Sequence, residues 1–355
     1  MKNGTGEKNM DWIKVKKAIK VVLFNIFFII VLLAIYESYL LFLVSHPSVL
    51  KKCPMRIRNS IGYLYNTGDR NVIQFSPDCA KFDEGLGYTL KPGQCTFSGK
   101  EFSNRYLVNK LGVRDDEKSL DHPKIIVAGD SFAMGWGVNQ DESFAKLIER
   151  KIGFKVLNSA VASYGTAREM MILRRVPIDR LQYLIIQYCE NDYEENMAYY
   201  LNHNVLPTMT EAEYRLNSEM DNQPKAYFIG KYLMLEIKKR IDEFRHRKQK
   251  DTNPIDKDDI DLFLNAIIHS QLNLNNVQII AFSMNGRNPD DNRAFPRELK
   301  KKIAAGDFPT YIRKMIVLDF SDILNDDNFY VLDDHLNHTG HQIIADVILQ
   351  NIKMH

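Results

Sequence analysis

The sequence predicts a mixed α/β fold with a parallel sheet, preceded by one membrane-spanning helix. From Lys124 onward, short apolar runs alternate with helix-like stretches, which is the pattern of a parallel sheet covered by helices. Near the N-terminus, residues 21–44 form an almost continuous apolar run. With 355 residues, the chain is long enough for one large domain with additions.

The overall charge argues against a nucleic-acid partner. The chain has 47 basic and 45 acidic side chains, a formal charge of +2, and 45% of its residues are hydrophobic. Such a balance is ordinary for a globular protein and provides no positive field that would attract nucleic acid. We therefore expect no nucleic-acid partner.

The apolar run at 21–44 predicts a transmembrane helix. At about 1.5 Å per residue it is long enough to cross a hydrocarbon core of about 30 Å. Lysines crowd the preceding tail, 1–20, which favours a cytoplasmic N-terminus and an exported remainder, periplasmic or at the cell surface. Basic residues after the run weaken this bias. A cleaved signal peptide is the alternative, but no small-x-small site follows the run, so we favour a signal-anchor.

Four cysteines follow the membrane segment, and three of them lie in an irregular region. We expect Cys79 to form a disulfide with Cys95, although the sequence equally allows Cys53 as a partner. No cysteine and histidine spacing typical of zinc appears, so neither a metal nor a cofactor is expected.

The chain divides into an irregular extracytoplasmic lead-in at 45–120 and a main domain at 121–355. A break in the α/β rhythm at 193–257 predicts an insertion, with a long amphipathic helix at 227–247 and a role as wall or lid over the site. The expected strands are 124–128, 155–158, 183–187, 277–282 and 316–319, and the expected helices are 141–152, 166–175, 258–270, 296–304 and 339–353.

Polar residues follow the first three strands of the predicted sheet. Ser131 ends a Gly-Asp-Ser turn after the first strand, a turn at 158–165 follows the second, and Asn191 follows the third. Because parallel strands end at one edge, these groups are expected to converge there. Each stretch alone is equally well explained as an ordinary capping turn.

A second polar stretch precedes the last helix. Asp333 and His335 are two residues apart, so in an extended segment both point to one side, and the carboxylate can orient the imidazole. His335 would then serve as the base that a serine nucleophile requires. The alternative is a polar turn that caps the helix. His338 and His341 are expected to face solvent or to cap that helix.

Taken together, the four stretches resemble the SGNH, or GDSL-like, hydrolase superfamily. The matching blocks, in order, are Gly129-Asp130-Ser131, the turn after Asn158, Glu190-Asn191-Asp192, and Asp333-Asp334-His335. This resemblance implies a flavodoxin-like three-layer sandwich and the hydrolysis or transfer of O-acyl groups. It also implies Ser131 as nucleophile, His335 as base, Asp333 as its orienting acid, and an oxyanion hole formed by Asn191 and the amides of Ser131 and Ser163.

Two features set this chain apart within the resemblance. Ser163 stands where the family usually has glycine, so either Ser163 or Gly165 supplies the amide next to the substrate. The close spacing of Asp333 and His335, and the lead-in segment 109–115, are similar to membrane-anchored alginate O-acetylation proteins. Arg287 follows a strand at the same edge and is a candidate for holding an anionic substrate, with a surface turn as the alternative.

The sequence therefore predicts a membrane-anchored serine esterase that removes O-acyl groups, in the first place O-acetyl, from a cell-envelope carbohydrate or lipid. One alternative is an O-acyltransferase that modifies an exported polysaccharide with a membrane-bound acyl-delivering partner. Another is a glycan-binding module without catalysis.

Overall fold

The structure of the protein is a computed structural model that describes residues 5–249 and 258–353. Within these ranges, side chains are described except at 5–11, 13 and 243–249. The chain forms two compact units: residues 1–69 with 225–253, and residues 70–224 with 254–355. The first boundary thus lies at Asp69, and the lead-in from Arg70 onward belongs to the same unit as the main domain. The two units are described separately.

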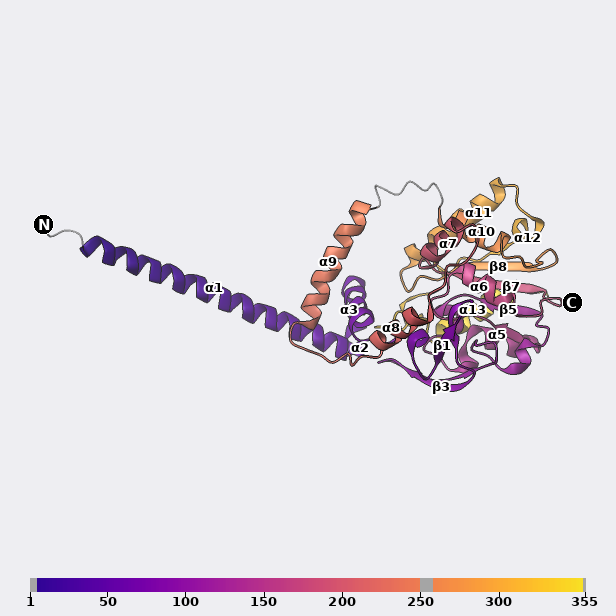
Figure 1. Cartoon of the computed structure of the whole chain (residues 1–355), viewed down its shortest axis with the longest axis horizontal. Coiled ribbons are helices and arrows are strands. Elements are labelled where there is room, and N and C mark those ends of the chain that lie inside the picture. The colour runs from indigo at the N-terminus through magenta and orange to yellow at the C-terminus, as the bar shows by residue number, and fades with distance from the viewer. Residues whose placement is uncertain (1–4, 250–257, 354–355) are drawn as a thin grey trace. The chain divides into compact units, whose positions relative to one another are not determined.

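Unit 1 is helical. It contains α1 (Thr5–Ser45), α2 (Pro47–Leu50), α3 (Met55–Gly68) and α9 (Lys231–Gln249) (Figure 1). The part of α1 from Lys14 to Ser45 is long and apolar enough to cross a membrane, and the predicted segment 21–44 lies within it. One long apolar helix near the N-terminus is therefore present, as predicted.

The α3 helix was not predicted, because residues 45–120 were expected to be irregular. Its buried residues Ile61, Leu64 and Tyr65 recur at helical spacing, and α3 packs against α1 and α9. Gly62 and neighbouring polar residues lower the helix propensity of this segment, so tertiary packing supplies the stability that propensity does not.

Unit 2 is built on a five-stranded sheet in the order β6-β5-β7-β8-β9, with every neighbouring pair parallel. Numbered along the chain, this order is 2-1-3-4-5, the flavodoxin-like arrangement. The strands are β5 (Ile125–Ala128), β6 (Val156–Asn158), β7 (Tyr183–Tyr188), β8 (Gln278–Ser283) and β9 (Ile316–Val317). The predicted fold class is confirmed.

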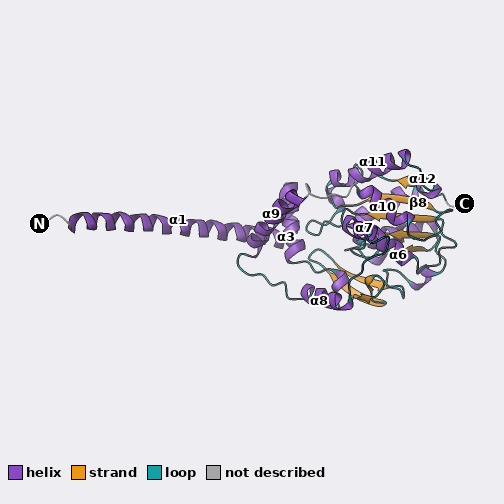
Figure 2. Ribbon diagram, turned by 45° about the horizontal axis from the view of Figure 1, so that its top comes forward, coloured by secondary structure: helices purple, strands orange, loops and turns teal. Residues whose placement is uncertain are grey.

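Helices cover both faces of this sheet (Figure 2). Ile125 and Val127 of β5 belong to one apolar cluster, and Ile126 and Ala128 belong to a second, because alternate side chains point to opposite faces. The first cluster includes α5 (Phe144–Ile152) and α13 (His338–Leu349); the second includes α6 (Thr166–Leu173), α10 (Asp259–Ile268), α11 (Pro289–Ala305) and α12 (Thr310–Arg313). The unit is a three-layer sandwich.

Most predicted helices start or end within a few residues of the observed bounds. The helix expected at 296–304 begins earlier, at Pro289, because the Asn288 side chain caps it and proline suits the first helical position. The helix expected from 141 is preceded by a 3-10 turn, η3 (Gln140–Glu142), and ends before Gly153, which has a φ of 72°.

The lead-in of unit 2 consists of two hairpins and short 3-10 turns. The elements are η1 (Ile73–Phe75), β1 (Ala80–Asp83), β2 (Gly87–Leu90), β3 (Gly93–Ser98), β4 (Ser103–Val108) and η2 (Glu117–Leu120). β1 pairs with β2 and β3 with β4, both antiparallel. A disulfide joins Cys79 to Cys95, which confirms the predicted pair; Cys53 is free, and Cys189 is free and buried.

The predicted insertion divides between the two units. α7 (Asp192–Leu201) and α8 (Glu211–Asp221) belong to unit 2, whereas α9 belongs to unit 1. α8 supports the segment around η1, since Asp221 accepts the N–H of Val72 and Ser218 donates to the carbonyl of Phe75. The insertion is therefore not a single lid, and part of the predicted range, 250–257, lies outside the described residues.

Candidate active site

Ser131 stands at the end of β5, where the strand turns into α4 (Ser131–Met134). The Asp130 side chain caps this short helix by accepting the N–H of Phe132 at 2.9 Å. Gly129 has a φ of 152°, and a Cβ there would lie 2.6 Å from the Cβ of Ala133. Only glycine therefore allows this tight turn, which leaves Ser131 half-buried at the carboxyl edge of the sheet.

Ser131, His335 and Asp333 form a continuous chain of hydrogen bonds. His335 Nε2 is 2.7 Å from Ser131 Oγ, and His335 Nδ1 is 2.5 Å from Asp333 Oδ1. With the Nδ1 proton directed at the carboxylate, Nε2 is left to accept the serine proton. The structure thus brings together three residues that are up to 204 positions apart in the sequence.

Asp333 is kept ionised although it is almost fully buried. Burial alone would raise the pKa of its carboxyl group, but the charge and hydrogen bond of His335 and the charge of Arg70 lower this pKa below its ordinary value. Arg70 Nη1 lies 3.4 Å from Asp333 Oδ1. A charged Asp333 fixes the tautomer of His335 and stabilises the imidazolium that forms when His335 takes a proton.

Aromatic rings surround the imidazole. The rings of Phe132 and Trp136 stack against His335, with centroids at 4.6 Å and 5.2 Å, and the Arg70 guanidinium lies 5.4 Å from the centre of a Trp136 ring. These contacts hold the plane of the imidazole and reduce its access to water. Phe132 directly follows Ser131, so the turn that carries the serine also carries a ring that packs against the imidazole.

Glu101 holds the loop that carries Asp333. Its carboxylate, in the turn between β3 and β4, accepts the backbone N–H groups of Val331, Leu332 and Asp333 at 2.8, 2.8 and 3.0 Å. Burial raises the pKa of Glu101, and the three N–H donors act in the opposite direction. Sequence reasoning did not identify this residue, because nothing in its neighbourhood resembles a known block.

Arg287 contacts the same loop through its side chain. Its buried guanidinium donates to Asp334 Oδ1 at 2.6 Å and to the carbonyls of Tyr330 and Val331. Its side chain is only 3% exposed. These contacts indicate a structural role for Arg287, and substrate binding stays a prediction.

The backbone amides of Ser163 and Gly165 were the two candidates for the oxyanion hole, and that of Gly165 already donates a hydrogen bond within the protein. Its N–H donates to Glu195 Oε1 at 3.0 Å, so Gly165 serves the packing of α6 and α7 and not a substrate. Ser163 is exposed and has a φ of 60°, a conformation that favours glycine, and its Oγ accepts a hydrogen bond from Gln74 Nε2 at 3.0 Å.

Asn191 lies at the same edge of the sheet. It is exposed and immediately precedes α7, three residues after β7, and β7 pairs directly with β5 through Ile186 and Ala128. Gln187 ties this strand to the serine turn, because its Oε1 accepts the N–H groups of Asp130 and Ala133. The polar stretches after the first three strands therefore end at neighbouring positions.

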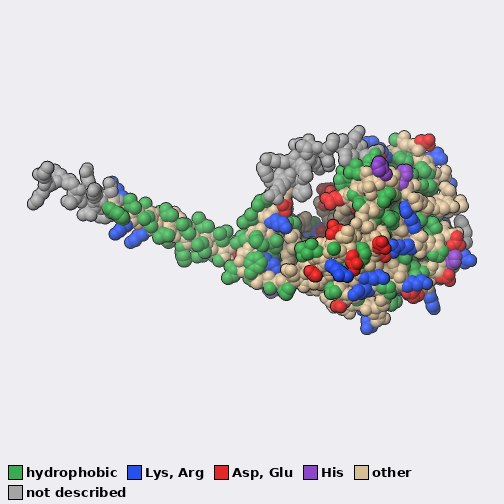
Figure 3. Space-filling view, in the orientation of Figure 1, with side chains coloured by type: hydrophobic (Ala, Val, Ile, Leu, Met, Phe, Trp, Pro, Cys, Tyr) green, Lys and Arg blue, Asp and Glu red, His purple; other side chains and the backbone are tan. Residues whose placement is uncertain are grey.

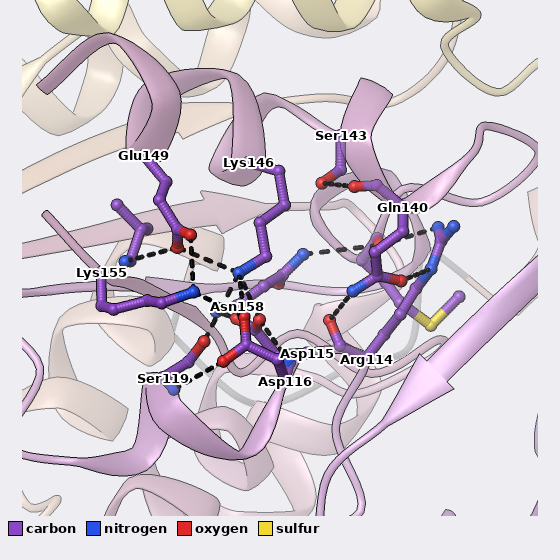
Figure 4. Close-up of polar contacts among 12 residues, drawn as sticks. Arg114, Asp115, Asp116, Ser119, Gln140, Ser143, Lys146, Glu149, Lys155 and Asn158 are labelled. Carbon is purple, nitrogen blue, oxygen red and sulfur yellow. Dashed lines mark hydrogen bonds and ion pairs between the residues drawn. The ribbon is translucent and has the colours of Figure 1, made fainter. Parts of the chain in front are cut away.

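A polar cluster from the lead-in supports the segment behind Ser131 (Figure 4). The buried guanidinium of Arg114 donates to the carbonyls of Met134, Gly135 and Val138, and it stacks 3.7 Å from the centre of the Tyr106 ring. Lys146 of α5 pairs with buried Asp115 at 2.5 Å. The lead-in thus supports the backbone that follows Ser131.

One histidine differs from its expected place. His338 is exposed, as predicted, but His341 is completely buried, with its Nδ1 accepting the N–H of Phe144 at 3.3 Å. Burial lowers the pKa of His341 to about 3, so the ring is neutral.

Among the described residues, no group of His, Cys, Asp or Glu side chains is arranged to hold a metal ion.

The comparisons with known proteins found similarity in structure but not in sequence. No family model matches the chain, and no curated protein matches its sequence. A structure assigned to the G-D-S-L family of lipolytic proteins, from Desulfitobacterium hafniense, is 13% identical, with a TM-score of 0.32, and the match covers 64% of this chain and 99% of the other.

Two further solved structures are similar at the same level. A structure assigned as an acylhydrolase from Bacteroides fragilis has 11% identity and a TM-score of 0.33, covering 66% of this chain and 92% of the other. A carbohydrate esterase has 13% identity and a TM-score of 0.34, covering 64% of this chain and 67% of the other. Because all these TM-scores are below 0.5, the function of this chain has to be argued from its own site.

Proposed function

We propose that this protein is a membrane-anchored serine esterase of the SGNH type that removes O-acyl groups, in the first place O-acetyl, from a cell-envelope carbohydrate or lipid. The observation that carries the proposal is the hydrogen-bonded series Ser131, His335 and Asp333 at the carboxyl edge of a flavodoxin-like sheet. A serine needs a base within hydrogen-bond reach and a third group that orients the base, and this series supplies both.

The reaction proceeds through an acyl-enzyme. Ser131 Oγ attacks the ester carbonyl while its proton passes to His335 Nε2, and the amides of Ser131 and Ser163 and the Asn191 side chain stabilise the oxyanion. As the tetrahedral intermediate collapses, His335 returns the proton to the departing hydroxyl. Water then attacks the acyl-enzyme by the same route and releases the acid.

The membrane location rests on α1. Its apolar segment from Lys14 to Ser45 suits one bilayer crossing, and the lysines at its start favour a cytoplasmic N-terminus. The disulfide between Cys79 and Cys95 supports an oxidising compartment for the catalytic unit, which is the periplasm or the cell surface. The substrate would then be a component of the envelope.

An O-acyltransferase uses the same acyl-enzyme with a sugar hydroxyl in place of water. The spacing of Asp333 and His335 favours this second candidate, and it requires a membrane-bound partner that delivers the acyl group. Mass spectrometry of envelope glycans separates the two. Deleting the gene of an esterase raises the number of acetyl groups on the glycans, whereas deleting that of a transferase lowers it. A glycan-binding module would leave their number unchanged.

Turnover tests the proposal directly. The full-length protein in detergent is expected to hydrolyse p-nitrophenyl acetate, and Ser131→Ala is expected to abolish this turnover. Asp333→Asn should lower kcat by roughly 10³- to 10⁴-fold, because a carboxamide in place of the carboxylate favours the wrong tautomer of His335. Turnover that is equal in Ser131→Ala and the wild type would contradict the proposal.

A further inference from the structure

The α9 helix has two faces of different character. Leu235 lies against Gly68 of α3, and Lys239 Nζ lies 5.0 Å from the centre of the Tyr63 ring, so this side packs within unit 1. Met234, Ile237 and Ile241 recur at helical spacing on the opposite side and are exposed, Ile237 by 61%. Within unit 1, no described side chain covers this apolar stripe on α9.

Glu37 of α1 fixes the place along α1 at which α9 begins. Its buried carboxylate accepts the N–H groups of Tyr232 and Leu233, in the first turn of α9, at 3.2 and 2.9 Å, and the hydroxyl of Tyr227 at 3.1 Å. A carboxylate at a helix N-terminus is doubly favoured, because it satisfies free N–H groups and the helix dipole. The start of α9 is thus tied to α1 at Glu37.

The apolar segment Lys14–Ser45 is longer than the roughly 20 residues that one crossing needs, and we place the outer end of the crossing near Glu37, before the predicted end at residue 44. Tyr36 and Tyr39 flank Glu37 and are both exposed, and Trp12 is exposed near the other end of the helix. Aromatic residues of this kind concentrate at the two membrane–water interfaces. Tyr36 and Tyr39 therefore mark the outer interface, and α9 starts at that level.

In Figure 1, α9 starts beside the C-terminal part of α1 and leads away from it, instead of running alongside it. A helix that starts at the interface and leads sideways away from the spanning helix can lie along the membrane surface. Its exposed apolar stripe is flanked by the cations Lys238 and Arg240, both exposed, and Ile229 just before the helix is 92% exposed. This is the composition of an interfacial amphipathic helix.

We infer that α9 is an interfacial membrane helix, whose stripe Met234, Ile237 and Ile241 inserts among the lipids that surround α1. The inference rests on α1 spanning the bilayer and does not depend on the esterase activity. The favoured occupant is lipid, because hydrophobic surface runs along α1 up to the foot of α9 (Figure 3), and a spanning α1 would be surrounded by lipid up to this level. A protein partner would not need the flanking cations, which suit anionic headgroups.

The consequence is a second membrane attachment for the catalytic unit. The chain passes between the two units after Asp69, after Pro224 and after Asn253. Two of these connections are the ends of the segment that contains α9. With α9 at the interface, the catalytic unit is attached to the membrane surface through all three connections and not through α1 alone.

The test measures lipid contact at single positions of the full-length protein. Cys53→Ser provides the background, since Cys189 is buried and Cys79 and Cys95 are paired. Single cysteines at Ile237, at Leu33 of α1 and at Leu216, which is exposed on α8, are labelled with an environment-sensitive fluorophore. The proteins are reconstituted into vesicles of phosphatidylcholine and phosphatidylglycerol, with and without nitroxide-labelled lipid.

Quenching by the nitroxide lipid at position 237 is expected within about twofold of that at position 33, with little at position 216. A label at 237 that responds like the one at 216, or that is shielded from aqueous iodide but not quenched by lipid, overturns the inference; the second result would indicate a protein partner. Absence of quenching at position 33 would show that α1 does not span the bilayer, and it would overturn the inference for that reason. Turnover of p-nitrophenyl acetate by each labelled protein reports separately on the esterase proposal.

Discussion

Glu101 accepts the backbone N–H of Asp333 at 3.0 Å, although the two residues are 232 positions apart. The same carboxylate also accepts the N–H groups of the two preceding residues, so one side chain fixes the backbone that presents the orienting acid. Because His335 takes its orientation from Asp333, the turn between β3 and β4 controls the geometry of the proposed base.

Glu101→Gln is expected to lower kcat by roughly 10- to 100-fold with little change in KM, because an amide cannot accept all three N–H groups and the Asp333 loop shifts. Steady-state kinetics with p-nitrophenyl acetate measure this. Glu117→Gln is the matched control, since Glu117 accepts a single N–H, that of Lys110, and is exposed. Equal kinetics in both variants would show that Glu101 has no positioning role.

Arg287→Lys separates a structural role from a substrate-binding one. Lysine cannot reproduce the forked contacts to Asp334 and to the carbonyls of Tyr330 and Val331, so the loop loses support from this side. We expect kcat to fall about tenfold and KM to stay within about twofold. A large rise in KM for an acidic substrate at constant kcat would instead support the substrate-binding role.

The oxyanion hole is tested by a pair of substitutions. Ser163→Gly keeps the amide and relieves the positive φ, so activity is expected to stay within a few-fold of the wild type. Asn191→Ala removes a donor, and kcat is expected to fall by about 10²- to 10³-fold. A large loss in Ser163→Gly would mean that the Ser163 hydroxyl contacts the substrate.

His341 makes stability depend on pH. Its pKa is lowered to about 3 in the folded protein, so its stabilising effect is present above the unfolded value near 6.5 and is lost as the pH falls towards 3. Over that window the wild type should lose up to about 1.4 kcal/mol per pH unit from this residue. His341→Asn should show a shallower pH dependence in chemical unfolding followed by circular dichroism; identical slopes would contradict a buried neutral ring.

The sheet and the approach of Ser131 to His335 could be predicted because their signals are local or ordered along the chain. The strands are apolar runs with turn residues after them, and Ser131, Asn191 and His335 follow strand ends or precede a helix. Parallel strands bring such positions to one edge, so chain order was enough to predict their convergence.

The supporting contacts could not be predicted, because each depends on a partner far away in the sequence. Glu101 and Gln74 act through residues that only the folded hairpins and α8 bring near. Arg287 and Gly165 stand at the predicted edge, but periodicity does not reveal that nearby carboxylates already bind them. The position of α9 depends on Glu37, which in the sequence only interrupts an apolar run.

The central claim is that Ser131 is a nucleophile activated by His335. Full-length protein in detergent is treated with a fluorophosphonate probe, and the modified peptide is identified by mass spectrometry. The expected result is one adduct, on Ser131, that is absent in Ser131→Ala and much slower to form in His335→Ala. An unlabelled wild-type protein, or an adduct that persists in Ser131→Ala, would contradict the claim.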